Sequence, residues 1–436
     1  MQIGFTKAEI KKIGEAFQWD GEKNLSIYET KFEQFFTQRS REYFLRKSQE
    51  WLQNLNCPEY LNEAWRRIEQ EETKAMENME HQTKGLLLEE VQREIIEKPA
   101  QKLAEMEGTG CRDMFKNKKL DELELMHRVF SRVENTLKFI LDEMNPYIEG
   151  RGRVIVEDEE LLKDPVAFTN ALLELKSEMD TMVEQSFNKD RKFQQARDKS
   201  FQNFMNVCQD TPTFIAAYCD HQFRGGLKGQ SEHEIEQGLD AVIRLFCCLH
   251  NRDVFIRAYT KYLGTRLLNK SSVNEDAEQL MLSKLKIQCG FNTVSKLSRM
   301  FTDMDLSKNV MQEFKNFQKA GGVVDGVVLN VDILSSGIWP EQIVHPCKLT
   351  PELQACTHKF EMFYKNKHSE RHLTWLYNNG QVELVTTFCP KKYTFVTSCY
   401  QAAILGLFNQ YSQLTYSQVQ ERCPLTRAGP GLHELA

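Results

Sequence analysis

Three amphipathic helical patterns follow one another in residues 253–304, and they constrain the fold more than any other stretch of the chain. Apolar side chains recur at helical spacing in residues 255–267, again in 277–285 and again in 294–304. Helices joined by short loops become antiparallel neighbours. The stretch therefore predicts the centre of a helix bundle.

Terminal residues mark where these helices should begin and end. Ser272, with Glu275 three residues later, matches a capping box, and Gly290 fits the stop of the same helix. A further helix is predicted before the stretch, over residues 232–250, and a last one is predicted to begin at Ser307. Together these segments predict a four-helix-type bundle.

The N-terminal half repeats long helical patterns without a convincing strand. The loops between them are short and rich in Pro or Gly, which is typical of an α-solenoid in which each unit covers its neighbour's apolar face. After a run that begins at Ser26, the patterns occupy residues 59–107, 115–145, 159–186 and 190–207.

Beyond Gly321-Gly322 the hydrophobic period changes from 3.6 to 2, which predicts strands. A first strand is expected over 327–334, followed by a helix with Thr350 as N-cap and Pro351 at its first position. Three more strands are expected over 373–377, 382–388 and 393–397, followed by a covering helix over 400–408. The predicted fold class is mainly α with a small α+β domain that contains a mixed sheet.

The predicted organisation has five parts. They are a weakly patterned lead-in (1–23), partial helical repeats (24–208), a helical bundle (209–320), an α+β domain (321–410), and a truncated winged-helix start with an unstructured tail (411–436).

Composition excludes several classes of protein. The formal charge of −6 argues against a general nucleic-acid binder, and no apolar run approaches the ~20 residues that a membrane span needs. The first residues lack the apolar core of a secretory signal. Twelve scattered cysteines without a C-x-x-C pair indicate reduced thiols, and hence the cytoplasm or nucleus.

The sequence lacks the motifs that usually carry catalysis. We find no Gly-rich phosphate loop, G-x-S-x-G or H-E-x-x-H. Cys356, His358, His368 and His372 imitate zinc spacing loosely, but a closed zinc site needs four convergent ligands, and a core cysteine with surface histidines is the favoured interpretation. No catalytic residue, metal or cofactor is expected.

The small sheet is the predicted binding site. A sheet of about four strands exposes an edge, and a foreign strand can add main-chain hydrogen bonds there. For any single residue, such as Leu373 or Trp375, a place in the chain's own core remains the alternative. The residues assigned to this site are Val328, Leu329, Val331, Ile333, Leu373, Trp375, Tyr377, Leu384, Val385 and Thr386.

Basic residues near this sheet form a second candidate surface. A solubilising surface is the simpler interpretation, and steering of an acidic partner is the functional one. The residues are Lys359, Lys365, Lys367, Arg371, Lys391 and Lys392.

The bundle stretch resembles the signature of the cullins, the scaffolds of multisubunit RING-type ubiquitin ligases, and most of all the SCF-scaffold class. The resemblance is carried by DVFIRAYTKYLGTRLL, DAEQLMLSKLKIQCGF and SKLSRMFTDM in residues 253–304. It continues through LNVDILSSGIWP (329–340) and HSERHLTWLYNNGQVELVTTF (368–388).

Membership of this family would imply a non-catalytic scaffold for protein ubiquitination. Cullins bind the N-terminal strand of a RING-box protein in the α+β domain, and the RING subunit recruits the ubiquitin-conjugating enzyme. Cullin regulators are further expected partners, whereas nucleic acid and membrane are not.

The ends of the sequence depart from the family pattern. The first repeat, which docks the substrate adaptor, has no counterpart here, so adaptor binding through that surface is not expected. The winged-helix region with the acceptor lysine for a ubiquitin-like modifier is also missing, since no run resembles I-V-R-x-M-K-x-R. The alternative function is therefore a truncated regulatory or structural protein that sequesters RING subunits. An enzyme in its own right is a third class, which the missing site constellations disfavour.

Overall fold

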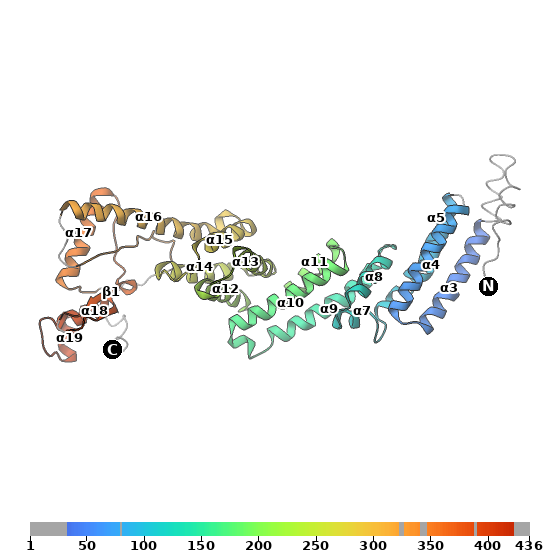
Figure 1. The fold of residues 1–436 in the computed structure, drawn as a ribbon, viewed down its shortest axis with the longest axis horizontal. Helices are drawn as coiled ribbons and strands as arrows, with labels where there is room; N and C mark the ends of the chain where they lie inside the picture. The colour runs from blue at the N-terminus through green and yellow to red at the C-terminus, as the bar shows by residue number, and fades with distance from the viewer. Residues whose placement is uncertain (1–32, 79–80, 322–326, 341–346, 388–389, 423–436) are drawn as a thin grey trace. The chain divides into compact units, whose positions relative to one another are not determined.

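The computed structural model describes residues 33–78, 81–321, 327–340, 347–387 and 390–422. They form two compact units (Figure 1). The first unit takes the chain up to Tyr218 together with Glu232–Phe255, and the second takes Cys219–Ser231 together with the chain from Ile256 onward.

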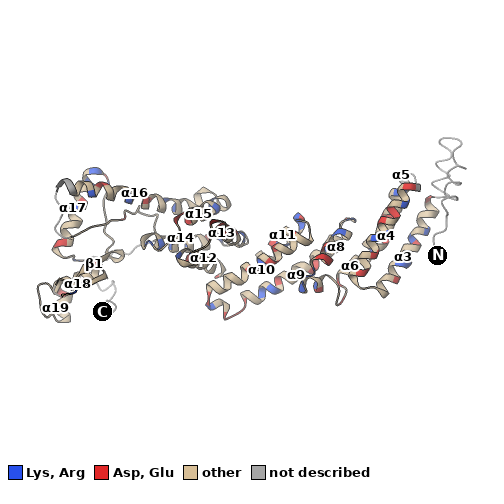
Figure 2. Ribbon diagram, in the orientation of Figure 1, with Lys and Arg blue, Asp and Glu red and all other residues tan. Residues whose placement is uncertain are grey.

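The first unit is built from helices that pack against one another (Figure 1). They are α3 (Gln34–Asn54), α4 (Cys57–Asn78), α5 (His81–Gln92), α6 (Ala100–Ala104), α7 (Cys111–Lys116), α8 (Leu120–Phe130), α9 (Leu137–Val156), α10 (Pro165–Ser186), α11 (Arg191–Met205) and α13 (Glu232–Cys247), while α12 (Thr211–His221) runs on into the second unit. Short turns of π-helix (Arg93–Glu97) and 3₁₀-helix (Leu161–Lys163) join some of them. Helix α9 packs against α11, and α8 packs against α10. Lys and Arg, in blue, are interspersed with Asp and Glu, in red, along these helices (Figure 2).

Local sequence explains how these helices begin and how closely they pack. Asp164 caps α10 by accepting hydrogen bonds from the backbone of Val166 and Ala167, with Pro165 in the first turn. Gly152 lets α9 approach α11, since a Cβ atom there would lie 2.4 Å from the ring of Phe204. The predicted helical solenoid is confirmed.

The second unit begins as a helical bundle and ends in a smaller α+β part. It contains a π-turn (Gln222–Gly226), α14 (Arg252–Leu268, whose first turn belongs to the first unit), α15 (Glu275–Cys289), α16 (Phe291–Gly321), α17 (Pro351–Lys367), a 3₁₀ turn (Tyr377–Asn379), β1 (Gln381–Val385), β2 (Thr394–Ser398), α18 (Cys399–Leu407) and α19 (Tyr416–Arg422). No helix in the described ranges combines the length and the apolar character that crossing a membrane requires.

Two predicted helix starts were wrong. The N-cap of α15 is Asn274, whose side chain accepts from the backbone of Ala277 at 3.0 Å, whereas the Ser272 hydroxyl instead donates to the Glu278 carboxylate. Ser307 begins no helix, because its hydroxyl bonds the carbonyl of Asp303 one turn earlier and α16 continues through it.

The same bundle buries an ion cluster that the sequence pattern did not reveal. Arg266 of α14 is fully buried, and its Nε and Nη2 donate to the two carboxylate oxygens of Glu278 at 2.7 and 2.9 Å. Its Nη1 donates to Asp220 at 2.7 Å. Tyr259 and Ser272 donate to the same Glu278 carboxylate at 3.2 and 3.0 Å. Burial opposes the charge of Arg266, but these carboxylates outweigh it and raise the pKa of the guanidinium.

Of the four predicted strands, two form. β1 and β2 pair antiparallel, from Gln381 opposite Ser398 to Val385 opposite Thr394, and α18 packs against both strands. Residues 327–334 and 373–376 carry no strand assignment, and Figure 1 draws them as coil. The prediction of strands there was wrong for this chain by itself, since a strand needs a ladder partner and the described residues supply none.

Candidate functional site

The two segments that lack a ladder nevertheless pack on one apolar core of the second unit. The centre of that core is Met311 and Phe314 of α16 with Phe360 and Tyr364 of α17. Half-buried side chains from both segments cover it, namely Leu329, Val331, Ile333, Leu373 and Trp375. The period-2 pattern therefore predicted correctly which side chains face the core, although no sheet forms there.

The first segment, residues 327–334, is attached to α16 by its odd-numbered residues. The backbone N–H of Ile333 donates to the Ser307 hydroxyl at 2.7 Å, and that hydroxyl lies 3.2 Å from the Ile333 carbonyl oxygen. The N–H of Val331 points to the sulfur of Met311 at 3.3 Å. Helix α16 thus occupies one lateral side of this extended segment.

An acidic residue of α16 holds the chain immediately beyond this segment. Asp303, which is 3% exposed, accepts from the N–H and hydroxyl of Ser335, both at 2.8 Å, and from the indole N–H of Trp339 at 2.9 Å. Pro340 packs against Gly264 of α14, where an added Cβ atom would lie 3.1 Å from the proline ring. These contacts fix the end of the segment against two helices of the bundle.

The other lateral side of residues 327–334 is open. In an extended chain the N–H and C=O of successive residues point to opposite sides. Since Val331 and Ile333 face α16, the backbone groups of Asn330 and Asp332 face away from it. Within the described ranges no backbone–backbone hydrogen bond joins this segment to another part of the chain. We call this side the open edge.

The second segment is oriented by its tryptophan. The indole N–H of Trp375 donates to the Glu361 carboxylate at 2.6 Å, and its ring meets Phe360 edge-on and stacks on Tyr377. Burial raises the pKa of the Tyr377 hydroxyl, and the Glu361 charge raises it further. Residues 372–375 make no backbone–backbone hydrogen bond within the described ranges.

The hairpin carries the remaining residues assigned to the site. Leu384 is half-buried, Val385 is exposed, and Thr386 is buried just after β1, where its hydroxyl accepts from the N–H of Tyr393. On β2, Phe395 and Val396 are 53% and 65% exposed and lie on opposite faces. Val328 and Val385 are the outliers of the assigned set, because they are 83% and 53% exposed and neither belongs to the core cluster.

The candidate basic residues lie in two places, drawn in blue in Figure 2. Lys359, Lys365, Lys367 and Arg371 lie on α17 or just after it, and Lys391 and Lys392 lie just before β2. Lys359 is half-buried and the others are exposed. Lys367 forms an ion pair with Glu313 of α16, and this pairing weakens its attraction for an acidic partner.

Sequence reasoning missed the residues that anchor this site. Asp303 and Ser307 belong to an ordinary helical pattern, so their bonds to residues 333–339 left no local signal. A buried position for a polar residue on the apolar face was the available clue, because such groups need partners.

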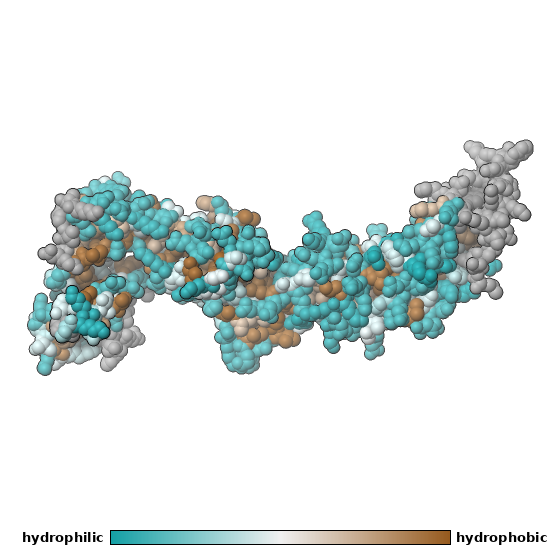
Figure 3. All heavy atoms as spheres, viewed as in Figure 1, coloured by the Kyte–Doolittle hydropathy of each residue, from teal (hydrophilic) through white to brown (hydrophobic). Residues whose placement is uncertain are grey.

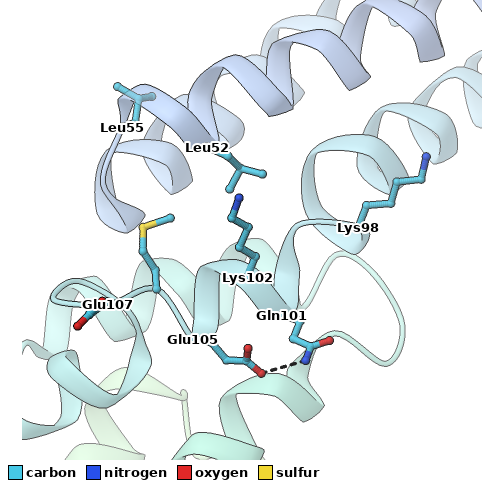
Figure 4. A pocket seen from close by; sticks show the side chains of 8 residues that line it. Leu52, Leu55, Lys98, Gln101, Lys102, Glu105 and Glu107 are labelled. Carbon is cyan, nitrogen blue, oxygen red and sulfur yellow. Dashed lines mark hydrogen bonds between the residues drawn. The ribbon is translucent and has the colours of Figure 1, made fainter.

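A cavity of about 570 Å³ lies elsewhere, in the first unit. Figure 4 shows Leu52 of α3 beside Lys102 of α6, and Leu55 just after α3 also lines the cavity. Among its polar side chains, Gln101 donates to Glu105, and Lys98 donates to Glu94 outside the lining. The two lysines and two glutamates that line it balance in formal charge.

The loose zinc pattern is not assembled in this structure. Cys356 is buried on α17, and His358 lies 3.7 Å from Glu361. In the part of the chain that the structure describes, no three His, Cys, Asp or Glu side chains converge as metal ligands would.

Comparison with known proteins matches both parts of this architecture. The family model of the cullin alpha solenoid domain matches residues 4–311, and that of the cullin alpha+beta domain matches residues 333–428. Cullin-3A of Arabidopsis thaliana is 33% identical over 404 residues, which is 92% of this chain and 55% of that protein. Cullin-3 of Dictyostelium discoideum is 32% identical, covering 92% and 52%, and human Cullin-4A is 32% identical, covering 91% and 52%.

The chain therefore spans about half the length of the curated relatives it matches. The matches do not decide the class within the family, so resemblance to the SCF-scaffold class stays a prediction. The two domain models together account for both the helical solenoid and the α+β part, and the chain belongs to the cullin family.

Proposed function

We propose that this protein is a non-catalytic scaffold of a cullin-RING ubiquitin ligase and binds a RING-box protein by strand addition. The observation that carries the proposal is the open edge. An extended segment already lies on an apolar core, and the backbone groups of Asn330 and Asp332 have no ladder partner within the described ranges. A foreign strand would satisfy them and cover the exposed hairpin residues.

The scaffold would act by holding reactants together. A RING subunit bound to the second unit recruits the ubiquitin-conjugating enzyme, and the helices of the first unit set a distance to substrate. Pre-positioning of this kind can lower a barrier by several kcal/mol without any catalytic group on the scaffold. The exposed Lys365, Arg371, Lys391 and Lys392 would speed the encounter with an acidic enzyme surface. We place the complex in the cytoplasm or nucleus.

Proline on the open edge tests strand addition. Asp332→Pro removes a backbone donor that has no backbone partner among the described residues, and Asp332 is exposed, so the isolated chain should keep its thermal stability. Binding of the RING-box protein should weaken at least tenfold, since one lost ladder bond is worth ~1 kcal/mol and the ring disturbs its neighbours. Asp332→Ala is the matched control and should bind normally.

The measurement is stoichiometric co-purification followed by titration calorimetry with the RING-box protein. Wild-type affinity in a folded Asp332→Pro variant would exclude the open edge as the docking site. A ubiquitination assay with the RING subunit and conjugating enzyme then separates the scaffold from a sequestering protein. Sequestration predicts a stable complex that transfers no ubiquitin to native substrates.

A further inference from the structure

The corner at which α15 meets α16 exposes two apolar side chains that the proposed function does not use. Ile287 is 80% exposed and Phe291 is 59% exposed. The core of the corner is already complete without them, because Leu285 and Val294 are fully buried. Apolar atoms reach the surface beside α15 in the space-filling view (Figure 3). Two large apolar side chains exposed at one corner are a candidate contact surface for a partner.

A groove leads away from this corner between the two helices. It measures about 300 Å³, and Leu282 and Phe301 contribute its apolar parts. Hydroxyl groups of Ser283, Ser298 and Thr302 also line it. Those of Ser283 and Thr302 donate to carbonyls of their own helices and can still accept hydrogen bonds. Because the helices are antiparallel, Lys286 lies at the end nearest the corner.

The residues of the corner itself carry charge of one sign, and Asp305, at the far end of the groove, is paired with Lys308 at 3.3 Å. Residues 279–302 contain no Asp or Glu but four basic residues, in a chain whose formal charge is −6. Arg299 is paired with Asp303 at 3.4 Å. Lys286 and Lys296 are exposed, and the Lys286 ammonium lies 5.3 Å from the centroid of the Phe291 ring. Positive charge therefore sits directly beside the exposed apolar pair.

We propose that this corner and groove bind an acidic, amphipathic segment of a partner protein. One or two bulky apolar side chains of the segment would cover Ile287 and Phe291, and its carboxylates would lie near Lys286 and Lys296. The groove hydroxyls would bond polar groups of the segment. A nucleic acid fits less well, because the aliphatic side chain of Ile287 offers no stacking surface.

A random 12-residue peptide library, selected on the immobilised full chain, tests this proposal. Counter-selection uses the Ile287→Ser/Phe291→Ser double variant, which exposes no new core because both residues are already outside it. The expected outcome is enrichment of peptides that have a net negative charge and contain Phe, Leu or Trp. These peptides should bind the wild-type chain and not the double variant. Failure to enrich any corner-dependent peptide, or enrichment of neutral or basic ones, overturns the proposal.

Binding of the enriched consensus is then measured by fluorescence anisotropy. The corner double variant and Lys286→Glu/Lys296→Glu should each lose at least tenfold in affinity, and added salt should weaken wild-type binding. Val154→Ser, at a 70% exposed apolar site in the first unit, is the matched control, and Asp332→Pro should also leave this affinity unchanged. That independence separates this site from RING-box binding.

Two further results would overturn the proposal. One is self-association of the chain that the corner double variant abolishes, which would make the corner a contact between copies. The other is tighter corner-dependent binding of phosphatidylserine vesicles or of a single-stranded oligonucleotide than of the acidic consensus peptide.

Discussion

Removing Glu278 from the buried ion cluster should destabilise the second unit strongly. In Glu278→Ala the guanidinium of Arg266, which is 0% exposed, keeps only Asp220 as a carboxylate partner. The other oxygen of Asp220 is already engaged by Arg224 at 2.8 Å. Two of the three ion-pair hydrogen bonds of Arg266 disappear, and the hydroxyl of Ser272 loses its acceptor. Breaking a buried pair in this way costs about 3–5 kcal/mol of unfolding free energy.

The reciprocal change should cost a similar amount for a different reason. Arg266→Met leaves the carboxylate of Glu278, which is 1% exposed, without its cation. A double variant, Arg266→Met/Glu278→Leu, removes both charges and fills the space with apolar atoms, so it should lie within about 1–2 kcal/mol of wild type. The double-mutant cycle should therefore show a coupling of several kcal/mol, because the single costs do not add.

Urea unfolding followed by circular dichroism measures these free energies. Hydrogen exchange of α14 and α15 shows whether the loss is confined to the second unit, since the two units need not unfold as one. A cost below about 1 kcal/mol for Glu278→Ala would refute the reasoning, because it would mean that water reaches and solvates Arg266. A double variant as unstable as the sum of the single ones would also refute it.

Three further predictions follow from other buried groups. Asp303→Ala should release Trp339 and its neighbours, seen as faster hydrogen exchange over 335–340 with α16 intact; unchanged exchange would show that Asp303 is not the anchor. Burial lowers the pKa of His127 below its ordinary 6.5, although Asp190 partly opposes this. As the pH drops below about 6.5, the unfolded state therefore binds a proton before the folded state does, and the free energy of unfolding should fall. His127→Gln should make the free energy of unfolding depend less on pH in this range. Burial raises the pKa of Cys57 to about 12, so native protein at pH 8 should resist maleimide at this position, and rapid labelling would contradict its burial.

The helical parts were predictable because the spacing of apolar residues along each helix indicates which of its faces is buried. The apolar spacing of residues 255–267 and 294–304 marks faces that the structure buries, including Phe255, Leu263 and Leu297. The predicted ends of the helices were less accurate. Ser272 and Ser307 resemble caps, but side-chain hydroxyls have other acceptors in a folded protein, and both bond tertiary or intrahelical partners instead.

The strands and the ion cluster could not be predicted in the same way. Alternation in residues 327–334 specifies which side chains face the core, but a ladder also needs a second backbone at the right distance. Similarly, Arg266 and Glu278 each look like surface residues of a charged helix. Only the tertiary arrangement of α12, α14 and α15 brings their charges together, and no local period encodes that.

The anchoring of the open edge bears on how tightly a partner strand can bind. Fixing the backbone of one residue costs about 1–2 kcal/mol in conformational entropy. Residues 331–335 are already fixed by Ser307, Met311 and Asp303, so a docking strand would bear only its own ordering cost. Binding to this edge should therefore depend on α16 residues that never touch the partner. Ser307→Ala should weaken RING-box capture, because it frees Ile333, while leaving the partner's own contacts unchanged. Titration calorimetry should show the loss as a less favourable binding entropy, and an unchanged affinity would mean that the core side chains alone hold the edge in place.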